Sequence, residues 1–302
     1  MKVILRPLAC LILALGIVSG IGGRASARAR QELMPEESAA KAKQLLQQVI
    51  AALGGQAYLN VHNSDCQGRI AHFGPVGDFP DFTDFRDLWL LPDKNRREYS
   101  IKNDQTVAAF LLGSDTLWFA PGGTTVMVFN GPEGWFLGKK GVEVEPDDVI
   151  RNFDDGLKTG MDAMLRARLN EPGVEARYAG PDIIDLKEAD WIEFSDSEHR
   201  DLRLGIEKST HLPLRWVIAT RDPETKRTSD VTTSYIQYMV QDGVRTPLNV
   251  EQYRNGIRTT QTYLSSCKYN TDLSPQLFTR AALEERATEQ SKKGHKDSKN
   301  KK

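Results

Sequence analysis

Short segments rich in β-forming residues alternate with turn residues along most of the chain, with turns about every ten residues. The pattern is clearest near the C-terminus, where Asp242-Gly243 separates two such segments and Asn255-Gly256 is a strong two-residue hairpin signal. The sequence does not show the regular strand–helix alternation of parallel α/β folds. It therefore predicts a mainly β protein with one antiparallel sheet, strongly curved or closed into a barrel, with helices against one face.

Two amphipathic helices are expected to cover this sheet. The first begins at Pro35, which suits a first helical turn, and ends at Leu53 before Gly54-Gly55. The second is inserted between strands over about Asp147 to Leu169 and carries an apolar face at helical spacing. Both helices need an apolar partner, which the sheet can provide.

Gly156 and Gly160 lie inside the second expected helix, where each glycine costs about 1 kcal/mol relative to alanine. One interpretation, the simpler of the two, is close packing of the helix against the sheet. The other is a yielding lid, because the side chains of Met161 and Met164 adapt to varied apolar partners.

The two ends of the chain differ from the rest. Residues 1–27 have the pattern of a cleaved signal peptide, with an apolar stretch over Leu8 to Val18 and a small-x-small cleavage site ending at Ala27. An uncleaved membrane anchor fits less well, because the apolar stretch is short for a span of roughly 20 residues. Residues 291–302 are rich in lysine, so we expect a disordered tail after a single domain over 28–290. The chain is thus predicted to be exported.

Removal of the signal peptide would leave two cysteines, Cys66 and Cys267. In an oxidising compartment such a pair is a natural disulfide, which would join an early strand to the last one. The alternative is two buried free thiols.

Motifs for common catalytic chemistry are absent from the sequence. It contains no Gly-x-Ser-x-Gly elbow, no His-Glu-x-x-His, no P-loop and no dinucleotide fingerprint after a strand. The histidines do not fall at metal-ligand spacing within one element, so we expect neither a metal nor a cofactor. With 40 Lys and Arg against 41 Asp and Glu, the chain lacks the basic excess of a nucleic-acid-binding protein. We predict that the protein is not an enzyme; the alternative is an active site assembled from scattered residues such as Asp84, Asp87, His72 and His199.

Three segments of the C-terminal part follow a recognisable order: His211-Leu-Pro-Leu-Arg-Trp216, then Asp242-Gly243-Val244-Arg245-Thr246-Pro247, then Lys268 to Phe278. Together with the opening helix and its Leu53-Gly54-Gly55, they resemble outer-membrane lipoprotein-sorting-like exported proteins. The resemblance implies a LolA/LolB-like half-barrel, in which an antiparallel sheet wraps around an apolar cavity and helices plug the open side. It also implies a lipidic ligand that is carried or sensed in the periplasm.

The principal hypothesis is an exported periplasmic protein that binds or carries a lipid or another hydrophobic ligand. Period-two alternation predicts that Leu214, Trp216 and Ile218 share one face of a strand, where they could line the ligand site. The inserted helix adds the candidate lining residues Phe153, Leu157 and Met161.

The alternative is a non-catalytic periplasmic sensor or assembly scaffold with the same fold. In that case the lysine-rich tail over 291–302 could dock on an anionic membrane or on a partner protein.

Overall fold

The computed structural model describes residues 33–73, 82–100, 124–138, 141–221 and 228–289. Contacts divide the chain into two units, Met1–Leu33 and Met34–Lys302, and the described residues belong almost entirely to the second. The expected signal peptide over 1–27 and the expected tail over 291–302 lie outside the described residues. Among the helices in the described ranges, none combines the length and the apolar character needed to cross a membrane.

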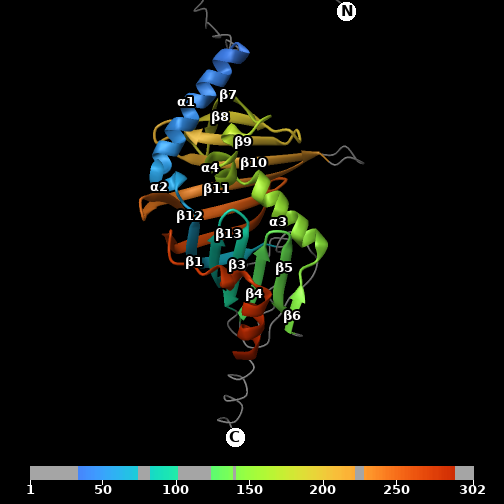
Figure 1. The fold of residues 1–302 in the computed structure, drawn as a ribbon. Helices are drawn as coiled ribbons and strands as arrows, with labels where there is room; N and C mark the ends of the chain where they lie inside the picture. Colours follow the sequence, from blue (N-terminus) through green and yellow to red (C-terminus); the bar gives the residue numbers. More distant parts are fainter. Residues whose placement is uncertain (1–32, 74–81, 101–123, 139–140, 222–227, 290–302) are drawn as a thin grey trace, which may run out of the picture. The chain divides into compact units, whose positions relative to one another are not determined.

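The described strands form one antiparallel sheet of 13 strands (Figure 1). The first six strands make one meander: β1 (Asn63–His72), β2 (Thr83–Leu90), β3 (Lys94–Ser100), β4 (Thr124–Asn130), β5 (Glu133–Gly138) and β6 (Gly141–Val144). The others make a second meander: β7 (Glu175–Ile184), β8 (Lys187–Ser195), β9 (Asp201–Glu207), β10 (Pro213–Arg221), β11 (Thr228–Gln241), β12 (Val244–Arg254) and β13 (Ile257–Tyr269). Since β6 and β7 are the two edges and do not pair with each other, the sheet is a curved half-barrel rather than a closed barrel. The prediction of a mainly β protein with a curved antiparallel sheet and covering helices is confirmed.

The first and last strands pair in the middle of the sheet, so β1 and β13 form a seam between the two meanders. Cys66 on β1 and Cys267 on β13 lie directly opposite each other and form a disulfide across a separation of 201 residues. Next to them, the register shifts at Gly68, where a Cβ would lie 2.1 Å from the carbonyl oxygen of Tyr263. The close approach of the two strands at this bulge therefore requires glycine.

Helix α1 (Pro35–Leu53), followed by the short α2 (Gln56–Leu59), packs on the second meander. It lies along the edge strand β7, where the Ser38 hydroxyl donates to the carbonyl oxygen of Tyr178 at 3.1 Å and accepts from its N–H at 3.0 Å. These bonds pair backbone groups that an edge strand otherwise leaves open. The helix ends at Gly54, whose φ of 129° and close approach to the carbonyl of Gly243 favour glycine.

The connection from β6 to β7 consists of α3 (Asp147–Thr159), α4 (Met161–Arg166) and the 3-10 helix η2 (Arg168–Asn170) (Figure 1). It lies on the same face of the sheet as α1, which we call the inner face. The prediction of one continuous helix over Asp147 to Leu169 was wrong, because the backbone becomes extended at Gly160 (φ −66°, ψ 143°). Glycine has a low helix propensity. The chain can therefore leave the helical conformation at Gly160, between the end of α3 and the start of α4.

The interpretation of the two glycines as points of close helix-to-sheet packing was also wrong. A Cβ added at Gly156 would meet no heavy atom of the described residues within 4 Å. At Gly160 the neighbouring atom is the carbonyl oxygen of Gly156, 3.0 Å from such a Cβ, and it belongs to α3 itself. Neither glycine is therefore required by contact with the sheet.

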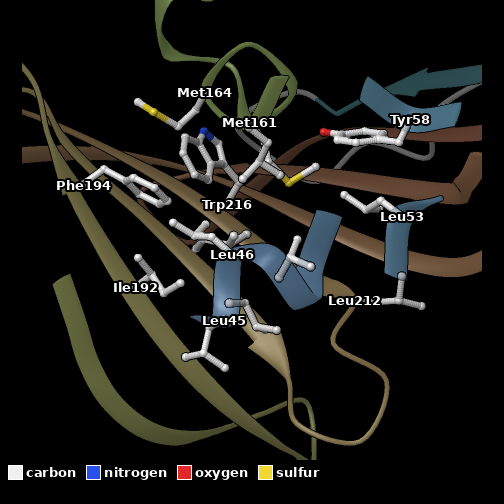
Figure 2. Packing of buried hydrophobic residues seen from close by; sticks show 14 of the residues in the cluster. Leu45, Leu46, Leu53, Tyr58, Met161, Met164, Ile192, Phe194, Leu212 and Trp216 are labelled. Carbon is white, nitrogen blue, oxygen red and sulfur yellow. The ribbon is translucent and has the colours of Figure 1, made fainter. Parts of the chain in front are cut away.

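Buried apolar side chains on the inner face form two clusters. The main core joins α1, α4 and the second meander, and Figure 2 shows the indole of Trp216 among Met161, Met164 and Phe194. The α3 cluster joins α3 to the first meander and consists of Ile70, Phe85, Tyr99, Met127, Phe129, Phe136, Val149 and Phe153.

The outer face of the first meander is covered by the C-terminal segment. Because side chains alternate along a strand, Val126 and Val128 point away from the α3 cluster to which Met127 belongs. They pack with Phe278, in the 3-10 helix η3 (Pro275–Phe278), and with Leu283, in the helical residues 280–289. The first meander is thus sandwiched between α3 and the chain end.

We expect the seam disulfide to stabilise the fold. Replacing both Cys66 and Cys267 by alanine should lower the free energy of unfolding by about 2–5 kcal/mol, because the bridge restricts a very long loop in the unfolded chain. Urea unfolding of the wild type with and without reductant, beside the double variant, measures this. Equal midpoints in all three samples would contradict the prediction.

Gly156→Ala should stabilise α3, because the added methyl group meets open space and alanine is the better helix former. The expected gain in the free energy of unfolding is about 1 kcal/mol. Gly160→Ala is the matched control and should bring no such gain, since Gly160 is extended and a Cβ there meets a carbonyl oxygen. The same gain for both variants would show that the break in the helix is not real.

Candidate functional site

The candidate lining residues from β10 do not all share one face. Trp216 belongs to the main core and Ile218 packs against it, but Leu214 belongs to another cluster, with Ile184 and Ala189. The cause is a register shift between β9 and β10 at Pro213/Arg215, which places an extra residue in β10. A bulge of this kind breaks period-two alternation, so the prediction that Leu214 faces the same way as Trp216 was wrong.

The candidate residues from the inserted helix are divided by the break at Gly160. Met161 is buried in the main core, whereas Phe153 is buried in the α3 cluster and Leu157 packs against it. The structure therefore brings together Trp216, Ile218 and Met161 in one place, and Phe153 with Leu157 in another.

Helix α4 is firmly held in the main core. Its side chains Met161, Met164 and Leu165 are buried. The hydroxyl of Tyr58 donates to the Asp162 carboxylate at 2.6 Å, and the guanidinium of Arg166 lies 4.3 Å from the centroid of the Tyr58 ring. Apolar, polar and cation–π contacts thus act together on this short helix.

The junction between α3 and α4 is also held by hydrogen bonds. The indole N–H of Trp216 donates to the carbonyl oxygen of Thr159 at 2.9 Å, and Arg168 donates to the carbonyl oxygen of Lys158. Arg168 also lies 3.2 Å from Asp196. Burial alone would raise the pKa of Asp196, but hydrogen bonds from Arg200 and Arg168 lower it to about 2. The C-terminal end of α3 is therefore a fixed point.

The remainder of α3 is held mainly by aromatic and aliphatic contacts. Phe153 stacks on Phe129, with ring centroids 4.2 Å apart, and on Trp89, with centroids 5.9 Å apart. Val149 and Leu157 add apolar contacts on the same side of the helix. Beneath α3 the sheet thus presents an aromatic-rich wall, which the helix covers. The wall consists of Phe85, Trp89, Tyr99, Phe129 and Phe136.

Next to this wall lies a polar group of residues, of which the sequence had pointed only to Asp87. The Arg97 guanidinium binds the Asp87 carboxylate at two points, from Nε at 3.1 Å and from Nη2 at 2.7 Å. Asn95 and Trp89 donate to the same carboxylate at 2.8 Å and 3.0 Å. Both oxygens of Asp87 are therefore satisfied, and the carboxylate is poorly suited to act as a general base.

Three further polar side chains on the inner face have buried atoms without a hydrogen-bond partner in the described part of the chain. They are the ring nitrogens of His72, the hydroxyl of Tyr99 and the hydroxyl of Thr125. Burial, with the charge of Arg97, lowers the pKa of His72 to about 4, so this imidazole is neutral near pH 7. Unpartnered buried polar atoms cost folding free energy, and they often mark a functional site.

The scattered catalytic candidates do not form a recognisable constellation. His72 and Asp87 are on β1 and β2, whereas His199 lies in the loop before β9. Within the described residues, no group of three or more His, Cys, Asp and Glu side chains is arranged to hold a metal ion.

Two hollows are found away from α3, beside the edge strand β7. One, of about 310 Å³, lies between the start of α1 and β7 and is lined by Pro35, Ala39 and Ala176. The other, of about 280 Å³, is lined mainly by polar residues around Arg200. The wall beneath α3 is instead filled by the side chains of that helix, so a ligand could reach it only if α3 moved.

Glu145, just before α3, is a buried carboxylate with neither oxygen hydrogen-bonded in the described residues. Burial, with the nearby charge of Asp148, raises its pKa from 4.5 to about 7. Since the folded chain then binds the proton more tightly than the unfolded chain, stability should fall as the pH rises from about 4.5 to 7, by on the order of 3 kcal/mol.

His72 has the opposite effect. Its lowered pKa means that the unfolded chain binds more protons between about pH 4 and 6.5, so stability should rise with pH over that range. In the wild type the two effects oppose each other. Glu145→Gln should leave a stability that rises with pH, and His72→Phe one that falls, as measured by urea unfolding from pH 4 to 8. Glu133→Gln, at an exposed position on β5, is the control, and a Glu145→Gln profile equal to that of the wild type would contradict the assignment.

Comparison with known proteins gives a likeness of fold. A DUF1329 family protein from Desulfovibrio piger has 12% sequence identity and a TM-score of 0.50, with 80% of this chain and 98% of that chain covered. A LolA superfamily protein from Nitrosomonas europaea has 13% identity and a TM-score of 0.48, with 80% and 99% covered. The lipoprotein LppX from Mycobacterium tuberculosis has 12% identity and a TM-score of 0.30, with 77% and 98% covered. No family model matches the sequence, and no curated protein matches it. The likeness to the DUF1329 family protein shows that the two chains share a fold.

Proposed function

We propose that this protein is an exported, periplasmic, non-enzymatic protein that binds a lipid or another hydrophobic ligand between the sheet and α3. The observation that carries the proposal is the contrast between α3 and its surroundings. Apolar side chains hold α3 on an aromatic-rich wall, while α4 and the junction at Thr159 are fixed by hydrogen bonds and burial.

Burial of an acyl chain on the wall can be compared with burial of the α3 side chains that it would displace. Each buried apolar side chain contributes about 1.5–3 kcal/mol, so Val149, Phe153 and Leu157 together hold α3 with about 5–9 kcal/mol. An acyl chain of 16 carbons gains about 13 kcal/mol when it is buried, at about 0.8 kcal/mol per methylene. In gross burial free energy, a long chain therefore gains more than the α3 contacts that it displaces, whereas a short chain gains less.

The break at Gly160 allows such a movement. With α4 fixed in the main core, α3 can turn about its C-terminal end without disturbing the second meander. Because Glu145 and Pro146 alone separate α3 from β6, this edge strand moves with the helix. Hinges of this kind absorb the change in backbone angles at a few residues that end an element. Release of the ligand follows when α3 returns to the wall.

Two features support the proposed periplasmic location of the protein. The pattern of residues 1–27 is typical of an export signal. The bridge between Cys66 and Cys267 is typical of a protein that folds in an oxidising compartment.

A second candidate function is a non-catalytic sensor or assembly scaffold with the same fold. The observation that favours it is that α3 already fills the wall with the protein's own side chains. Under this alternative the lysine-rich residues 291–302 would contact an anionic membrane or a partner protein.

The test compares the binding of a fluorescent 16-carbon fatty-acid probe to the wild type and to variants of α3. Leu157→Ala removes part of the contact that a ligand must displace, so the probe should bind about 3–10-fold more tightly than to the wild type. Asp155→Ala, on the exposed side of α3, is the matched control and should not change the affinity.

Mass spectrometry of organic extracts from the protein purified from a bacterial periplasm gives a second measurement. We expect a co-purified lipid. Absence of both a lipid and probe binding, in the wild type and in Leu157→Ala, would overturn the proposal and favour the scaffold.

A further inference from the structure

Two hydroxyl groups lie on the wall beneath α3 without a partner in the described residues. Tyr99 on β3 and Thr125 on β4 are 1% and 4% exposed, and neither hydroxyl makes a hydrogen bond to another described residue. They are directly opposite each other on neighbouring antiparallel strands, so both side chains face the inner side of the sheet. Tyr99 is itself part of the α3 cluster, together with Phe153.

These hydroxyls are not needed for the polar contacts nearby. The Asp87 carboxylate receives its bonds from Arg97, Asn95 and Trp89. The hydroxyl of Tyr99 lies close enough to the Arg97 guanidinium to interact with its charge, but within the described residues the two groups form no hydrogen bond of normal geometry. In the closed protein the two hydroxyls therefore lose their hydration and gain no hydrogen bond within the described residues in return.

The charges around the hydroxyls indicate what kind of group they can accept. The charge of Arg97 is balanced by Asp87 through a two-point contact, and His72 is neutral near pH 7. A carboxylate bound here would lose its hydration and would gain little from the Arg97 charge, because Asp87 already neutralises that charge. An uncharged acceptor, in contrast, can take a hydrogen bond from each hydroxyl at little cost of desolvation.

We propose that Tyr99 and Thr125 form the polar end of the ligand site and bind an uncharged, hydrogen-bond-accepting head group such as an ester carbonyl, in preference to a free carboxylate. This inference rests on the proposed function, because the hydrocarbon part of the ligand must lie along the wall that α3 uncovers. The two hydroxyls then gain the partners that they lack in the closed protein.

The experiment measures displacement of the fluorescent probe at pH 8 by three competitors with the same 16-carbon chain: hexadecane, methyl palmitate and palmitate. For the wild type we expect methyl palmitate to bind more tightly than palmitate. Tyr99→Phe and Thr125→Val remove one hydroxyl each and should weaken binding of the ester about 3–10-fold, while binding of hexadecane stays unchanged. Ser100→Ala, an exposed neighbour on β3, is the control and should leave all three affinities as they are.

Folding of the variants is checked by urea unfolding. Both should be at least as stable as the wild type, because each removes a buried hydroxyl that has no partner. Loss of ester binding in a folded variant that still binds hexadecane supports the proposal.

Different results would overturn the head-group assignment and the proposed function. Palmitate binding as tightly as its ester, or an ester affinity that neither substitution changes, overturns the head-group assignment and leaves the hydrophobic site in place. A wild type that binds none of the three competitors overturns the proposed function, and the head-group assignment with it.

Discussion

The pairing of the first strand with the last is the constraint on which the rest of the structure depends. Because β1 and β13 meet in the middle of the sheet, the two meanders grow outward from the seam and end at opposite edges. The chain must therefore connect β6 with β7 across a face of the sheet, and α3 and α4 make this connection. The disulfide between Cys66 and Cys267 fixes the seam covalently.

The connection has two parts with different physical character. Helix α4 is held by apolar burial, by the Tyr58–Asp162 hydrogen bond and by the hydrogen-bonded junction before it. Helix α3 is held through Phe153 and its apolar neighbours, and it covers hydroxyls that have no partner in the part of the chain that the structure describes. Apolar contacts are non-directional, so another apolar molecule can replace them, whereas a fixed hydrogen-bond geometry cannot be replaced in that way. This difference is the physical basis for assigning the movable part to α3.

The sequence predicts the parts of the structure that depend on local pattern. Turn residues such as Asn255-Gly256 place the hairpins, and α1 follows from its apolar stripe and its terminal glycines. The break at Gly160 and the reversed face of Leu214 could not be predicted, because a helix break and a β-bulge depend on tertiary packing more than on residue type. The polar group around Arg97 could not be found either. Its strand, β3, reads as Lys-Asn-Arg-Arg-Glu, a pattern that gives no sign that Asn95 and Arg97 are turned inward beneath a helix.

The central claim is that a hydrophobic ligand takes the place of α3 on the wall while the second meander and the seam are unchanged. Backbone hydrogen–deuterium exchange of the protein, with and without saturating 16-carbon ligand, tests it most directly. We predict faster exchange over Asp147–Thr159 in the presence of ligand, with Met161–Arg166 and the seam strands unchanged or slower. Bound ligand together with unchanged or slower exchange over Asp147–Thr159 would contradict the account, because α3 would then still lie on the wall.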